Sequence, residues 1–209
     1  MALAQPIRGI RDEVAALKRA RILAAAVELF YENGYANTTL DAVAERLGVT
    51  KPLIYSHFSS KSKILAVICS RGIGSSLEAI DSILPLNVSA TEKLATISRR
   101  FVTAVLETQM YIAILFREEK NLAVTDFRII NDMRRDFDRK LTVLVREGAA
   151  TGEFRVTDPH MTALAIGGMV SWAYVWYREK GRLPLADVAD QMTKLILAMV
   201  QAKDTVQAE

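Results

Sequence analysis

The residues from Thr39 to Lys63 limit most strongly what this chain can fold into, because they hold two short helical patterns separated by one glycine. In the first pattern, apolar residues recur at i, i+3, i+4 and i+7, the spacing of one helical face, as Leu40, Val43, Ala44 and Leu47. Gly48 is expected to end this helix, since glycine enters the left-handed conformation without a Cβ penalty. Thr38 or Thr39 is expected to cap its start, and Thr50 the start of the second helix.

The second helix carries Pro52 in its first turn, where a missing N–H group costs nothing. Two helices joined by a short turn that contains glycine form a helix-turn-helix, whose second helix enters the major groove of DNA. Two ordinary helices of an all-α domain are the alternative, because a helix–glycine–helix pattern alone is not specific. Ile54 and Phe58 are expected to be core residues of this unit.

A longer string of residues is more specific. It consists of Phe30, Gly34, Tyr35, Thr39, Ala44, Gly48, Val49, Tyr55, His57, Phe58 and Lys61. With these residues the chain resembles, over about 15–68, the DNA-binding domain of the TetR (tetracycline repressor) family. Ser62 departs from the pattern, since the family often has an acidic residue there. The resemblance implies a dimeric transcriptional regulator, and it implies that Tyr55 and His57 bond backbone phosphates of double-stranded DNA.

The N-terminal turn of a reading helix is best placed to meet base edges. Thr39, at a helix N-terminus, can hold a phosphate by its hydroxyl and amide groups, and Lys61 can do so by its charge. The predicted DNA contacts are therefore Thr39, Thr50, Lys51, Pro52, Leu53, Tyr55, His57 and Lys61. Residues 1–65 hold nine Lys or Arg and six Asp or Glu, and the other 144 residues hold 18 of each, so the net charge of +3 belongs to this region.

Long periodic stretches with few glycines and prolines predict an all-α fold of about nine helices. The helices outside the pair described above are expected at 12–33, 61–84, 91–108, 110–116, 126–150, 161–177 and 185–202. On 126–150 the inward residues are expected to be Ile129, Met133, Phe137, Leu141 and Leu144, with Gly152 as the stop. The predicted organisation is a flexible arm (1–11), a three-helix DNA-binding domain (12–65), a larger helical bundle for ligand binding and dimerisation (66–202) and a polar tail (203–209).

Residues 161–177 contain no charged side chain. A membrane span is one interpretation, but the stretch is shorter than the ~20 residues that a span needs and contains Thr162, Gly167, Gly168 and Ser171. Burial in a bundle or a dimer interface fits better. We therefore expect a homodimer formed through helices at about 158–179 and 185–202. Two copies related by a two-fold axis would read a palindromic operator.

Aromatic and methionine residues of the bundle are candidates for the walls of a cavity that takes a small apolar or amphipathic ligand. They are Phe101, Met110, Tyr111, Phe116, Met133, Phe137, Met169, Trp172 and Trp176, and ordinary core packing is the alternative for each. The strings at 116–122 and 176–183 resemble a branch of the family that controls lipid, steroid or aromatic-acid breakdown and often senses acyl-CoA thioesters. Arg117, Lys120, Arg178 or Arg182 could meet an anionic ligand group, or could be solvated surface charges.

The sequence gives no support to an enzyme. His57 and His160 are the only histidines, and the chain has no phosphate-binding glycine loop and no metal-ligand spacing, so we expect no cofactor and no metal. Cys69 lies on an apolar helical face and is expected to be a buried, inert thiol. No apolar leader follows Met1, which indicates the cytoplasm. The leading hypothesis is a ligand-released repressor, and the alternative is a helical small-molecule-binding or scaffold protein without DNA binding.

Overall fold

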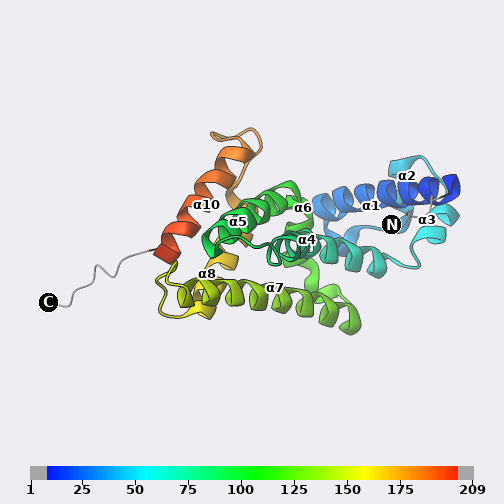
Figure 1. The fold of residues 1–209 in the computed structure, drawn as a ribbon. Coiled ribbons are helices and arrows are strands. Elements are labelled where there is room, and N and C mark those ends of the chain that lie inside the picture. The colour runs from blue at the N-terminus through cyan, green and yellow to red at the C-terminus, as the bar shows by residue number, and fades with distance from the viewer. Residues whose placement is uncertain (1–8, 202–209) are drawn as a thin grey trace.

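The computed structural model describes residues 9–201, and within that range every regular element is a helix, as predicted (Figure 1). The elements are α1 (Ile10–Asn37), α2 (Leu40–Leu47), α3 (Lys51–His57), α4 (Lys61–Ile83), α5 (Ala90–Glu107), α6 (Gln109–Glu118), the 3-10 helix η1 (Glu119–Asn121), α7 (Val124–Ala150), α8 (Pro159–Ser171), α9 (Ala173–Trp176) and α10 (Leu185–Gln201). The predicted helix 161–177 is divided at Trp172 into α8 and the four-residue α9. The other predicted helices each correspond to one helix of the structure.

The first helix is longer than predicted and contains a break. Ile10 and Arg11, which we expected in a flexible arm, begin α1; residues 1–8 of that arm and the predicted tail 203–209 lie outside the described residues. Gly34 has φ 80° and ψ 158°, so it interrupts α1, and the chain then makes one further turn to Asn37. The glycine therefore marks a break in the helix rather than its end.

The molecule is elongated, with α1–α3 at one end, the bundle at the other and α4 passing between them (Figure 1). We call α1–α3 the head and α5–α10 the body. The head packs around buried apolar residues such as Phe30, Ile54 and Ile64, and this core extends to Ile114 on α6. Because α4 belongs to both cores, the head is joined to the body by a continuous helix, as predicted, and not by a flexible linker.

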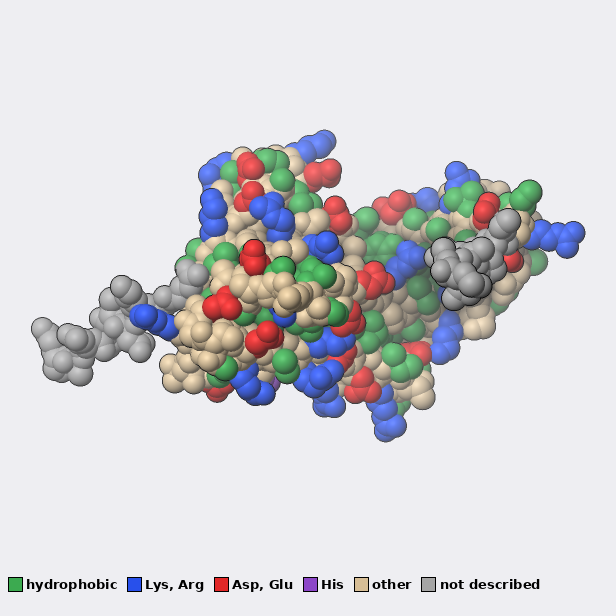
Figure 2. Space-filling view, viewed as in Figure 1, with side chains coloured by type: hydrophobic (Ala, Val, Ile, Leu, Met, Phe, Trp, Pro, Cys, Tyr) green, Lys and Arg blue, Asp and Glu red, His purple; other side chains and the backbone are tan. Residues whose placement is uncertain are grey.

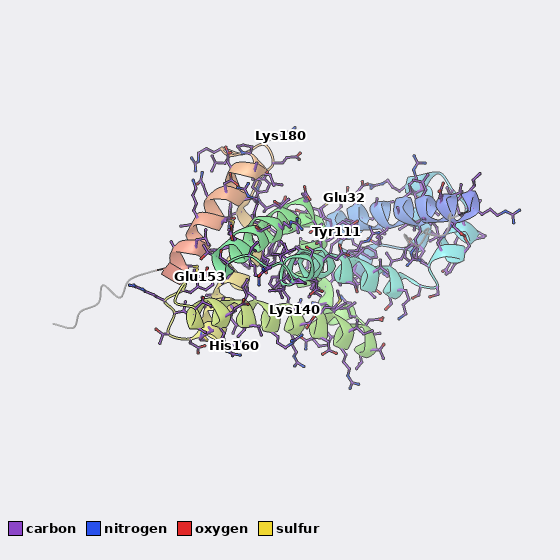
Figure 3. The ribbon with its side chains drawn as sticks, viewed as in Figure 1. Glu32, Tyr111, Lys140, Glu153, His160 and Lys180 are labelled. Carbon is purple, nitrogen blue, oxygen red and sulfur yellow. The ribbon has the colours of Figure 1, made fainter. Side chains whose placement is uncertain are left out.

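Helices α4 and α6 approach each other closely in the middle of the molecule, where Tyr111 lies beside α4 (Figure 3). A Cβ atom on Gly72 of α4 would lie 3.2 Å from the Cδ1 atom of Ile112 on α6. A larger side chain at this glycine would therefore push the two helices apart. The same two helices line the cavity described below, so their separation is set at that point.

The inward face of α7 differs from the prediction at one end. Phe137, Leu141 and Leu144 are buried as expected, but Ile129 is 57% exposed and Ile130 is buried in its place. Ile130 lies seven residues before Phe137, which is two helical turns, so it shares the face of Phe137 and Ile129 does not. The periodic pattern was therefore assigned one residue out of phase at this end.

Helices α8 and α10 keep apolar side chains exposed in the single chain. Ala163, Ile166 and Val170 of α8 face the core, whereas Met161 and Trp172 are 59% and 60% exposed. The all-round burial that we expected for 161–177 is therefore incomplete in one chain.

Within residues 9–201 no helix is long and apolar enough to cross a membrane. In the view of Figure 2, acidic and basic side chains are intermixed over the body.

Candidate functional site

The turn between α2 and α3 has the geometry that the sequence predicts. Gly48 adopts the left-handed conformation, with φ 64°, and its N–H group donates to the carbonyl oxygens of Ala44 and Glu45. Thr39 is the N-cap of α2, because its side-chain oxygen accepts from the N–H of Ala42 at 3.1 Å. Thr50 precedes α3 but makes no side-chain cap bond, so the prediction for that cap is wrong. Its exposed hydroxyl is not used in the cap.

The side chains of α3 divide into an inner and an outer set. Ile54 and Phe58 are 0% and 3% exposed, which confirms them as core residues. Most of the predicted DNA contacts lie on the surface: Thr39, Thr50, Lys51, Pro52 and Tyr55 are exposed, and Leu53 and His57 are half-buried. The first turn of α3 therefore presents hydroxyl, ammonium and apolar groups to solvent without loss of any core contact.

The ammonium group of Lys51 already has a partner on α2. It bonds Asp41 Oδ2 at 2.8 Å, and this bond raises the pKa of Lys51. Both side chains are exposed, so the ion pair is weak and each side chain can readily exchange its partner for an ion from solvent. Sequence analysis missed Asp41, although its place in the first turn of α2 brings it within reach of the start of α3.

Other cations of the head hold its helices together. Arg19 donates to the carbonyl oxygen of His57 at 2.7 Å and lies 4.1 Å from the ring centroid of Phe58, so it fixes the end of α3 to α1. Arg46 pairs with Glu28 and Glu32 of α1. Some of the basic side chains of the head are thus already bonded to other groups of the head.

Lys61 lies at the start of α4, as predicted, and its ammonium group bonds backbone carbonyl oxygens around the end of α1. Its Nζ atom lies 2.8 Å from the carbonyl oxygen of Tyr35, 3.3 Å from that of Ala36 and 2.8 Å from that of Thr38. An ammonium group has three N–H donors, and all three face these carbonyls. In this geometry Lys61 joins the start of α4 to the end of α1.

The body contains a cavity of about 320 Å³ between α4, α5, α6, α7 and α8. It is lined by Gly72, Ile73, Ser76, Phe101, Val105, Ile112, Leu115, Phe116, Arg134, Asp138, Leu164, Gly168 and Ser171. Two predicted wall residues, Phe101 and Phe116, are among them. A third, Phe137, lies behind the wall, with its ring centroid 4.6 Å from that of Phe101.

The other predicted wall residues lie elsewhere. Met110, Trp172 and Trp176 are 40%, 60% and 49% exposed and do not line this cavity. Tyr111 lines a wider groove of about 850 Å³ along another face of α4. Met133 packs against the core of the head, and Met169 packs against the core of the body. The aromatic and methionine residue types did not indicate which side of each helix faces the cavity.

The polar wall of the cavity is formed by Arg134 and Asp138, one helical turn apart on α7. Arg134 bonds Glu119 at 2.7 Å, and burial raises the pKa of the Asp138 carboxyl group. We had named other cations as candidates for an anionic ligand. Arg117 instead bonds carbonyl oxygens of α1, and Arg178 bonds carbonyl oxygens of its own loop.

Cys69 is fully buried, which confirms that part of the expectation, and burial raises the pKa of its thiol to about 12. Within residues 9–201 no group of three or more His, Cys, Asp or Glu side chains could hold a metal ion.

Two helices that meet at a left-handed glycine, with the second one exposing its first turn, define a helix-turn-helix DNA-binding protein. Residues 22–68 match the family described as bacterial regulatory proteins, tetR family, and residues 87–200 match the tetracyclin repressor-like C-terminal domain. The chain therefore belongs to the TetR family of DNA-binding transcriptional regulators. This membership replaces the alternatives of an enzyme and of a scaffold without DNA binding.

Several relatives match this chain along most of their own length. The fatty acid metabolism regulator protein of Bacillus subtilis (strain 168) is 25% identical over 89% of this chain and 97% of its own length. A regulatory protein of the tetR family from Rhodococcus RHA1 is 28% identical, with a TM-score of 0.80 over 90% of this chain and 98% of that one. AibR, in a crystal structure with isovaleryl coenzyme A and operator DNA, has a TM-score of 0.74 at 24% identity over 85% of this chain and 97% of that one.

Proposed function

We propose that this regulator binds a palindromic operator as a homodimer and releases it when a mainly apolar ligand of the acyl-CoA class enters the cavity of the body. The observation that carries the proposal is that α4 both begins at the head and lines the cavity. Lys61 begins this helix directly after the head, and Gly72, Ile73 and Ser76 of the same helix line the cavity. A ligand in the cavity therefore touches the helix that holds the reading helices.

On the DNA side, the exposed first turn of α3 would meet base edges. Thr50 and Lys51 supply hydrogen bonds, and the apolar surface of Pro52 suits a thymine methyl group. Thr39, Tyr55 and His57 would bond phosphates and so fix the position of the head without reading sequence. Leu53, half-buried at the same turn, adds apolar contact.

A dimer is supported by the open apolar sides of α8 and α10. Met161 and Leu164 are exposed on α8, Trp172 directly after this helix is also exposed, and Leu195 on α10 is 56% exposed. A second copy of the chain would cover these side chains across a two-fold axis. Two reading helices related in this way would meet half-sites about one helical turn, ~34–36 Å, apart.

The ligand class is supported by the cavity and by the relatives. Its wall is apolar apart from Ser76, Arg134, Asp138 and Ser171, and about 320 Å³ lies at the small end of the ~300–1,000 Å³ usual for ligand sites. Such a volume suits a short acyl group, with the remainder of a coenzyme A outside. One relative regulates fatty acid metabolism, and AibR binds isovaleryl coenzyme A.

Release requires only that the ligand prefer the state in which the two heads no longer fit the operator. The shift in the equilibrium equals the difference between the ligand's affinities for the two states. A test is an electrophoretic mobility shift on DNA upstream of the chain's own gene, at two salt concentrations, with acyl-CoAs of increasing chain length and with free coenzyme A. We expect short acyl-CoAs to release the DNA and coenzyme A alone to have no effect. A complex that no acyl-CoA releases would refute the ligand class, and equal binding to unrelated DNA would refute the operator.

A further inference from the structure

The polar end of the cavity is connected to the head through Arg134, the short helix η1 and the end of α6. The side chain of Arg134 lines the cavity, lies 5.7 Å from the ring centroid of Phe116 in the same wall, and bonds the carboxylate of Glu119 at 2.7 Å. Glu119 does not line the cavity. Arg134 thus stands between the apolar wall and a carboxylate outside it.

Glu119 is the first residue of η1, and the last residue of η1 is also held. The side-chain amide of Asn121 donates to Glu118 Oε2 at 2.9 Å. The short helix is therefore fixed at one end to α7, through Arg134, and at the other to the last residue of α6. Glu119 and Asn121 therefore hold the two ends of the same short helix.

Glu118 holds the broken part of α1. Its side chain is buried, and its Oε1 atom accepts from the backbone N–H of Tyr35 at 3.3 Å and from Arg117 Nε at 3.0 Å. The guanidinium group of Arg117 in turn donates to the carbonyl oxygens of Phe30 and Tyr31. The end of α6 thus holds α1 on both sides of the interruption at Gly34.

The segment 35–38 is the last part of the chain before the reading unit. Thr39, which follows it, is the N-cap of α2, and α2 leads through Gly48 into α3. Lys61 holds the same segment from α4 through its three carbonyl contacts. A displacement of this segment would therefore move α2 and α3 relative to α4.

We propose that Arg134 reads the ligand: an oxygen-bearing end, a thioester carbonyl or a carboxylate, bonds its guanidinium group, displaces Glu119 and so loosens the hold of Arg117 and Glu118 on α1. This inference rests on the proposed release by a ligand in the cavity. An apolar group without such an end would fill the cavity and leave the Arg134–Glu119 pair in place.

The chemistry of the cavity agrees with that ligand class. The planar guanidinium group donates in a fixed fork, which suits an oxygen acceptor, and the surrounding wall is apolar. Asp138 lies one turn further along α7, and burial raises the pKa of its carboxyl group.

The first experiment needs no ligand. Glu119→Gln removes the charge that Arg134 binds, and Asp132→Asn is the matched control, because Asp132 is an exposed carboxylate on α7 paired with Arg135 at 3.9 Å. Hydrogen exchange of the Tyr35 amide, followed by NMR on the full chain, reports the bond to Glu118. We expect Glu119→Gln to raise this exchange rate several-fold and to weaken operator binding, while Asp132→Asn changes neither. A Tyr35 exchange rate in Glu119→Gln equal to that of the unaltered chain overturns the relay.

The second experiment uses isovaleryl coenzyme A and free isovalerate as probes. Arg134→Leu replaces the guanidinium group with a shorter, apolar side chain, and Arg135→Leu is the control for loss of one charge on α7. A probe that bonds Arg134 raises Tyr35 exchange in the unaltered chain and in Arg135→Leu, but not in Arg134→Leu. A response to coenzyme A thioester alone identifies the carbonyl, and a response to isovalerate identifies the carboxylate. An equal response in Arg134→Leu overturns the role of Arg134.

The two proposals fail in different ways. If both probes leave the operator complex and Tyr35 exchange unchanged, the acyl-CoA class is refuted, and the Glu119→Gln result still decides the relay. If the probes release DNA from all variants alike, the proposed function stands and the relay is refuted.

Discussion

The ammonium group of Lys61 bonds the carbonyl oxygen of Tyr35 at 2.8 Å and lies 4.4 Å from the centroid of the ring of the same residue. Lys61 begins α4, and Tyr35 belongs to the last turn of α1. A cation at a helix C-terminus satisfies carbonyl groups that have no partner within the helix and complements the helix dipole. The contact thus joins α4, which follows the head, to the last turn of α1 beyond the break at Gly34.

This geometry leads to a prediction that separates two roles of Lys61. Lys61→Met should lower the free energy of unfolding by roughly 1–3 kcal/mol, because partly buried carbonyls lose a charged donor, and should leave the salt dependence of DNA binding unchanged. Loss of a phosphate contact would instead reduce the slope of log K against log salt by ~0.9. Denaturant unfolding and a salt titration measure the two quantities. Lys120→Met, at an exposed lysine, is the control.

The Asp41–Lys51 pair leads to a second prediction. Lys51 must exchange a carboxylate for a phosphate when DNA binds, and Asp41 itself repels the DNA backbone. Asp41→Asn should therefore tighten binding a few-fold at low salt, and the gain should shrink as salt screens the charges. Glu45→Gln makes the same charge change on α2 away from Lys51 and should tighten binding less. Equal effects of the two variants would mean that only net charge matters.

The head was the most predictable part of the molecule, because its determinants are local in the sequence. The end of α2 needs a residue in the left-handed conformation, and Gly48 supplies it. The burial of Ile54 and Phe58 follows from helical spacing. The cap at Thr50 failed because Pro52 and the turn geometry already start α3 without a side-chain bond. Lys61 could not be assigned, since its partners lie 23 to 26 residues away in a break whose shape the sequence does not reveal.

The cavity was much less predictable. Its wall combines two or three residues from each of five helices, and several of them, such as Ile73, Ile112 and Leu115, are aliphatic residues that occur throughout any core. Large aromatic residues were the natural candidates, yet Trp172 and Trp176 lie on the surface. Which side of a helix meets a cavity depends on how the helices pack, and spacing along one helix does not contain that information.

The buried thiol gives a third prediction, on pH. Burial raises the pKa of Cys69 to about 12 in the folded chain, above the ~8.5 of an exposed thiol. The folded state then keeps a proton that the unfolded state loses, so stability falls as pH rises from about 9 towards 12. Cys69→Ala, compared with the unaltered chain by denaturant unfolding across that range, should lack this loss. Equal slopes would show that the thiol does not contribute.

The fourth prediction concerns the proposed dimer. Trp172, which directly follows α8, is 60% exposed, and its ring meets that of Tyr174 edge-on at 6.1 Å. Trp172→Glu should place a charge in the contact between copies and shift the chain to monomers in sedimentation, with little loss of folding stability, since the side chain is not in the core. Operator affinity should fall strongly, because each head then binds its half-site alone. Val143→Glu, at a side chain 46% exposed on α7, is the control and should remain dimeric. If Trp172→Glu stays dimeric and keeps its operator affinity, the two copies meet through another face, and the open sides of α8 and α10 need a different occupant.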